Sequence, residues 1–132
     1  MLFDSYALTG NRTLVEIATS HADRTLLNHV RPDGSSFHVV EYNATRRRVI
    51  KQVTAQGYSD NSTWNRGQAW GIHGLANGAF LGLLLWGNQF FAYCLRVPKM
   101  SYLETSRKMA SYFLDNIPPD DIVPWRTRCL SM

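Results

Sequence analysis

Hydrophobic spacing divides the chain into helical and extended segments. Residues Met1–Leu8 look like the end of a helix, which Gly10 closes because glycine tolerates the left-handed conformation that follows many helices. Apolar side chains then recur at helical spacing, and we expect a second helix that runs to about His29. Thr13 and Glu16 have the spacing of a capping box at its start. Two helices joined by a short turn form an αα-hairpin.

A change to β-branched and aromatic residues follows the second helix. Residues Arg31–Gly34 have the composition of a turn, since Pro and Gly favour turns. The segment Ser35–Tyr42 has the composition of a short strand, and a second strand is expected near Val49–Thr54. We therefore predict a short β-hairpin within about residues 35–54, with Asn43–Arg48 at its tip.

A third helix is expected after the polar residues Asp60–Thr63, several of which are good N-caps. It should begin near Trp64–Arg66, which places Arg66 and Trp70 one turn apart on the same face. The following block, Gly78–Pro98, is apolar all round. Because the block is short for a transmembrane helix and contains Gly, Asn and Gln, a buried helix, a membrane span and an atypical insertion all stay open.

A fourth helix follows this block. Ser101 and Glu104 have the spacing of a capping box, and Pro118 stops the helical pattern after about Asp115. The buried stripe of this helix is expected to contain Tyr102, Ser106, Met109 and Phe113. Successive capped helices favour an all-α domain of stacked hairpins, although no tight sequence repeat connects them.

Composition narrows the classes of function. The 132 residues suffice for one domain or a piece of one. The net charge is +4, but the basic run Arg46–Arg48 is typical of a solvated turn, so nucleic acid is not an expected partner. Cys94 and Cys129 lack zinc-site spacing and the histidines show no HExxH pattern, so neither a metal nor a cofactor is expected. No signal peptide is visible, and the compartment stays open.

The strongest candidate chemistry lies in Gln56–Gly74, which reads QGYSDNSTWNRGQAWGIHG. Aromatic rings beside amide and guanidinium donors are typical of a carbohydrate site. The C–H face of a sugar stacks on an aromatic plane, and its hydroxyl and carboxylate oxygens accept hydrogen bonds from planar donors. A helix start whose aromatic side chains only fill the core explains the same composition equally well.

Three segments together resemble a known family. DGSSFHVVEY, QGYSDNSTWNRGQAWGIHG and MSYLETSRKMASYFLDNIPPDDIVPW are similar to the unsaturated glucuronyl hydrolases, which form glycoside hydrolase family 88. The resemblance covers roughly Met1–Ala76 and Lys99–Trp125, and the RGQAW motif favours this group over the related rhamnogalacturonyl hydrolases. It implies an (α/α)6 toroid, of which residues 1–132 would form a partial, incomplete domain of about three helical hairpins from the middle of the enzyme.

The resemblance also implies a substrate and a reaction. Members act on lyase-generated oligosaccharides that end in an unsaturated uronic acid, and they release that acid by hydrating its C4=C5 double bond. The implied substrate-binding residues are His38, Gln56, Trp64, Arg66, Gln68 and Trp70. Arg66 would be the partner of the uronate carboxylate. Structural alternatives stay open: His38 as an interior histidine, Trp70 in the core, Gln56 in a turn, and Arg66 paired with Asp60.

Several departures from the family pattern qualify this interpretation. The catalytic Asp pair lies upstream of the matched segments, and neither Asp4 nor Asp60 is its counterpart. Residues 78–98 resemble an insertion such as translated non-coding sequence, and residues 126–132 leave the pattern. We therefore expect a chain without catalytic residues that is inactive and folds poorly by itself. The alternatives are a non-catalytic helical carbohydrate-binding or interaction module, and a membrane-associated protein anchored by Ala79–Leu95, against which polar residues near the middle of that segment argue.

Overall fold

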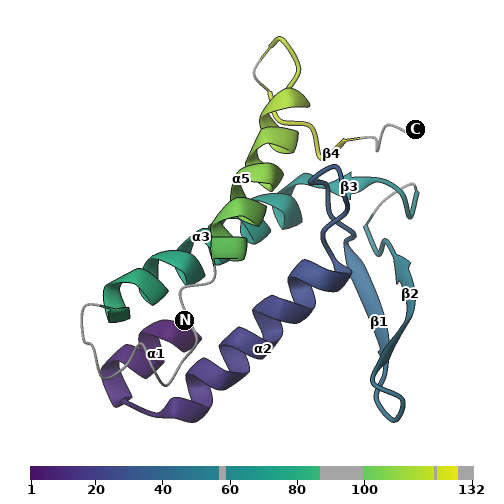
Figure 1. Cartoon of the computed structure of the whole chain (residues 1–132). Helices are drawn as coiled ribbons and strands as arrows, with labels where there is room; N and C mark the ends of the chain where they lie inside the picture. The colour runs from purple at the N-terminus through teal and green to yellow at the C-terminus, as the bar shows by residue number, and fades with distance from the viewer. Residues whose placement is uncertain (57–58, 87–99, 121, 128–132) are drawn as a thin grey trace.

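The computed structural model describes residues 1–56, 59–86, 100–120 and 122–127 (Figure 1). Its helices are α1 (Leu2–Thr9), α2 (Arg12–Asn28), α3 (Asn65–Trp86) and α5 (Met100–Asp115). Its strands are β1 (Val39–Asn43), β2 (Arg48–Val53), β3 (Thr63–Trp64) and β4 (Arg126–Thr127). The described chain is therefore mostly helical and carries a small β-hairpin between α2 and α3, as the sequence predicted.

Helices α1 and α2 form the predicted helical hairpin (Figure 1). Gly10 adopts the left-handed conformation at φ 70° and ends α1. The side chain of Asn11 then accepts a hydrogen bond from the backbone N–H of Thr13 at 3.1 Å. The predicted capping box of Thr13 and Glu16 is wrong, because the chain has already reversed at Gly10 and Asn11 caps α2 two residues earlier. Helix α2 ends at Asn28, close to the expected end.

The hydrophobic core lies where α2, α3 and α5 meet. Its buried members are Leu75 and Ala79 from α3 and Tyr102 and Met109 from α5, with Ala22, Leu26, Val30, Ile72 and Leu103 packed around them. The hydroxyl of Ser106 donates to the carbonyl of Ile72 at 2.9 Å, which ties α5 directly to α3. Within the described residues the helices form two pairs, α1 with α2 and α3 with α5, where about three hairpins were predicted.

Helix α5 follows the predicted buried stripe except near its C-terminal end, and its predicted N-terminal cap is wrong. Ser101 is not its cap, because the helix already begins at Met100. Near the other end Tyr112 is buried, and Phe113, which the sequence assigned to the stripe, is only half-buried. The Tyr112 hydroxyl lies 3.2 Å from the Thr127 Oγ1 atom of β4, so a contact with a distant segment decides which aromatic ring turns inward.

The β-hairpin is shorter at its start than predicted. Strands β1 and β2 pair antiparallel, but β1 begins at Val39 rather than at Ser35. Ser35 and Ser36 are buried outside this sheet, where the guanidinium of Arg31 donates to the Ser35 hydroxyl at 3.0 Å and to the Ser36 carbonyl at 3.1 Å. The basic run Arg46–Arg48 is exposed at the tip, as predicted.

The apolar block begins as a helix. Residues Gly78–Trp86 continue α3 without a break, whereas residues 87–99 lie outside the described part of the chain. Of the predicted non-family tail, Arg126–Thr127 form β4, which pairs with β3. The insertion and the tail stay predictions. Across the described helices, no stretch combines the length and the apolar character that a membrane crossing requires.

Candidate functional site

Strand β3 and the first turns of α3 place three predicted site residues together. Trp64 ends β3, and Arg66 and Trp70 follow one turn apart on α3, as the sequence predicted. Gly67 permits this arrangement, because a Cβ atom there would lie 2.8 Å from the Trp64 ring. Trp64 is buried at 7% exposure, whereas Arg66 is exposed and Trp70 keeps 62% of its surface accessible. Trp64 thus forms the base of the site, and Trp70 offers an open ring.

The Arg66 guanidinium lies among three indole rings. Its central carbon is 4.7 Å from the ring centre of Trp64, 5.7 Å from that of Trp70 and 5.1 Å from that of Trp125, all within cation–π range. Trp64 meets Trp70 edge to face at 5.4 Å. Among the described residues Arg66 forms no ion pair, so the alternative pairing with Asp60 is not observed. The Asp60 carboxylate instead accepts the backbone N–H of Thr54 at 2.8 Å.

His38 lies against the Trp64 ring as well. The two ring centres are 4.5 Å apart at an angle of 39°. The Nδ1 atom of His38 accepts the backbone N–H of Ala55 at 3.2 Å, and it lies 3.4 Å from the Thr54 hydroxyl. Because Nδ1 accepts, the neutral imidazole carries its proton on Nε2. We call the group of His38, Trp64, Arg66, Trp70 and Trp125 the aromatic cluster.

The two predicted glutamines lie outside the aromatic cluster. Gln68 is fully buried; its Oε1 accepts from the Ser36 hydroxyl at 2.7 Å, and its Nε2 donates to the carbonyls of Gly34 at 2.7 Å and Met109 at 3.0 Å. Both N–H donors of Gln68 are therefore engaged inside the fold. Gln56 is exposed, and in the described residues it makes no hydrogen bond. Substrate contacts of Gln56 and Gln68 stay predictions.

Trp125 is the member of the aromatic cluster that the sequence analysis did not single out. It is 58% exposed, and its ring centre lies 6.2 Å from that of Trp64. The backbone N–H of Asn65 donates to the Trp125 carbonyl at 3.3 Å, where β3 pairs with β4. The one sequence signal was its place at the end of the third segment that resembles the family. Pairing between two strands of two residues leaves no periodicity to find.

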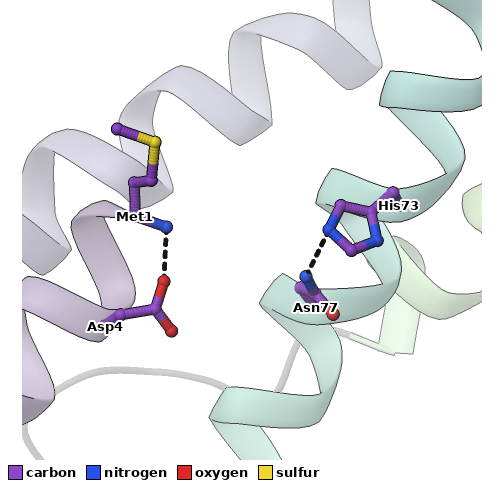
Figure 2. Close-up of polar contacts among 4 residues, drawn as sticks. All are labelled: Met1, Asp4, His73 and Asn77. Carbon is purple, nitrogen blue, oxygen red and sulfur yellow. Dashed lines mark hydrogen bonds and ion pairs between the residues drawn. The ribbon is translucent and has the colours of Figure 1, made fainter.

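Other polar groups lie apart from the aromatic cluster. Figure 2 shows His73 beside Asn77 on α3, with the Nε2 and Nδ2 atoms 2.9 Å apart, and the Met1 amine against Asp4 at the start of α1. The hydrogen bond from the Met1 amine and the positive charge of that amine lower the pKa of Asp4. Burial lowers the pKa of His29, which lines a groove of about 690 Å³ between α2 and the β-hairpin. No predicted site residue lines that groove.

Comparisons with known proteins address the family. No protein-family model matches the chain. The unsaturated glucuronyl hydrolase of Bacillus sp. strain GL1 is 36% identical over 118 residues, which cover 89% of this chain and 27% of the relative. A crystal structure of the Bacillus sp. GL1 enzyme matches with a TM-score of 0.77 at 34% identity and covers 95% of this chain and 29% of the enzyme.

A second solved structure is similar over the same share of the chain. It is an unsaturated glucuronyl hydrolase mutant from Streptococcus agalactiae complexed with dGlcA-GalNAc6S, with a TM-score of 0.65 at 32% identity. It too is matched over 95% of this chain and 29% of its own length. Sequence and fold agree on one group of proteins, of whose length the chain spans less than a third. The chain therefore resembles the unsaturated glucuronyl hydrolases over nearly its whole length.

Proposed function

We propose that the aromatic cluster binds the unsaturated uronic acid at the end of a lyase-generated oligosaccharide. The observation that carries this proposal is the guanidinium of Arg66, which lies among three indole rings and forms no ion pair within the described residues. A guanidinium binds a carboxylate through two parallel hydrogen bonds. The exposed rings of Trp70 and Trp125 supply apolar surface for the C–H face of the sugar.

The remaining predicted residues take supporting roles in this proposal. His38 lies against the Trp64 ring and helps to fix it, and Gln56 follows directly on Ala55, whose backbone N–H donates to the His38 ring. Gln68 fixes the wall behind the site through its three internal hydrogen bonds. The ligand of the Streptococcus agalactiae complex contains an unsaturated glucuronyl group, which supports the same class of substrate here.

The proposed reaction type is that of the family, hydration of the C4=C5 double bond. A proton adds to one alkene carbon and the hydroxyl of water to the other, and the resulting hemiketal opens to release the neighbouring sugar. This step needs an acid whose pKa is matched to proton donation. The aromatic cluster contains no carboxyl group, so we propose that the 132-residue chain binds the substrate without turning it over.

Calorimetric titration with an unsaturated glucuronyl disaccharide tests the binding role of Arg66. A hydrogen-bonded ionic contact contributes about 1.5–3 kcal/mol, so Arg66→Ala should weaken binding by about 10- to 100-fold. Arg46→Ala removes another exposed arginine, at the hairpin tip, and should leave the Kd within about twofold, because exposed charges at a distance are screened by salt. Equal affinities of the Arg66→Ala variant and the unsubstituted chain would refute the carboxylate role.

Two further measurements complete the test. Alkene absorbance in the ultraviolet should persist when the chain is incubated with the disaccharide, and its loss above a blank would overturn the proposed inactivity. If the chain binds a neutral disaccharide as tightly as the charged one, a non-catalytic carbohydrate-binding module explains the aromatic cluster better, since stacking on indole rings does not require a carboxylate.

A further inference from the structure

The position of Trp125 is fixed by contacts that come from another part of the chain. Asn65 donates its backbone N–H to the Trp125 carbonyl at 3.3 Å and its side-chain Nδ2 to the Pro124 carbonyl at 2.7 Å. The Oδ1 atom of the same side chain accepts from the Thr127 hydroxyl at 3.2 Å. Asn65, which lies between Trp64 and Arg66 in the sequence, thus forms hydrogen bonds with Pro124 and Thr127, on both sides of Trp125.

This attachment delivers one exposed ring to the Arg66 guanidinium. The central carbon of Arg66 lies 5.1 Å from the Trp125 ring centre, closer than the 5.7 Å to Trp70 on the helix of Arg66 itself. The electrostatic attraction between a cation and the face of an indole favours this position of the side chain. A free arginine side chain samples many rotamers, and restricting it to the rotamer that fits a ligand costs conformational entropy and weakens binding.

We infer that Trp125 is a positioning residue that holds the Arg66 guanidinium ready for a carboxylate. The inference rests on the proposed function of the aromatic cluster and assigns its specificity for a charged sugar in part to Trp125. A ring that only stacks on the sugar would contribute equally to charged and neutral ligands. A ring that orients Arg66 contributes chiefly to ligands that carry a carboxylate.

The first test needs no ligand and uses NMR of the Arg66 Nε–H group in the full chain. Trp125→Phe keeps an aromatic face, whereas Trp125→Leu keeps bulk without one. The ring-current shift of this proton should be largely retained in Trp125→Phe and should move toward the value of a free arginine in Trp125→Leu. Ile122→Ala, an exposed apolar substitution in the same segment, is the matched control and should leave the shift unchanged. An unchanged shift in Trp125→Leu would overturn the inference.

The second test compares an unsaturated glucuronyl disaccharide with its uncharged methyl ester. Trp125→Leu should lower the preference for the charged disaccharide by about three- to tenfold, and Trp125→Phe should restore most of it. An equal loss for both ligands would make Trp125 a stacking surface only and would overturn the inference. If the unsubstituted chain binds neither ligand, the proposed function fails, and the Nε–H shift still decides whether Trp125 positions Arg66.

Discussion

Gln68 offers the sharpest test of how this fold is held together. The side chain is fully buried and makes three hydrogen bonds, one from Ser36 and two to the carbonyls of Gly34 and Met109. It thereby joins the loop before β1 to helices α3 and α5. Gln68→Leu keeps a similar volume and removes every hydrogen bond at once, so the change isolates the polar contribution.

The expected magnitude follows from the number of partners that are left behind. A buried polar group deprived of its partner costs about 1–3 kcal/mol, and three such groups remain in Gln68→Leu, so we expect a loss of about 3 kcal/mol or more. Gln52 makes one hydrogen bond, from Nε2 to the Asn28 carbonyl at 2.7 Å, and Gln52→Leu should cost about 1 kcal/mol. Gln56 is exposed, and Gln56→Leu should change the stability by less than about 0.5 kcal/mol.

Urea titration followed by tryptophan fluorescence measures these three losses. At a slope of about 1.5 kcal/mol per molar urea, the Gln68 variant should unfold at about 2 M less urea than the unsubstituted chain. The chain exposes large apolar side chains such as Leu27 and Phe80, so the titration is run at submicromolar concentration to limit self-association. Equal midpoints for Gln68→Leu and Gln56→Leu would refute the role of the buried hydrogen bonds.

Two further predictions concern backbone strain and alkaline pH. At Gly34 the φ angle is +91°, and an added Cβ atom would lie 2.5 Å from the Lys108 carbonyl oxygen. Gly34→Ala should therefore lower the free energy of unfolding by about 3 kcal/mol or more, whereas Gly10→Ala, where a Cβ atom meets open space, should lower it by only about 1 kcal/mol. Thermal unfolding measures both losses, and equal losses would contradict this clash. Burial raises the pKa of Tyr102 above its ordinary 10.0, and the hydrogen bond to Asp23 and the charge of Asp23 raise it further. The folded state therefore holds this proton more tightly than the unfolded chain, and stability falls as the pH rises above 10.0. Tyr102→Phe should flatten that fall in urea titrations between pH 9 and 11, and an unchanged slope would argue against it.

The helices and the hairpin could be predicted from local sequence because their signals are local. Gly10 ends α1 by its left-handed conformation, and the polar residues before Trp64 mark the start of α3. Some errors arose where a distant contact decided the outcome. Ser35 and Ser36 have the composition of a strand with their neighbours, but Ser36 forms an isolated bridge with Val30, and its hydroxyl donates to the buried Gln68 of α3.

The candidate site divides in the same way. The sequence by itself determined that Arg66 and Trp70 lie on one face at the start of a helix that follows Trp64, because residues four apart share a face. The same motif carries the resemblance to the family. Only the tertiary structure decided that Trp125 joins them, since this contact depends on the pairing of β3 with β4 across a long separation in sequence. It also decided that Gln68 turns inward, because the carbonyls that accept its N–H groups come from other segments. Local periodicity describes which side chains share a face, and it carries no information on what that face meets.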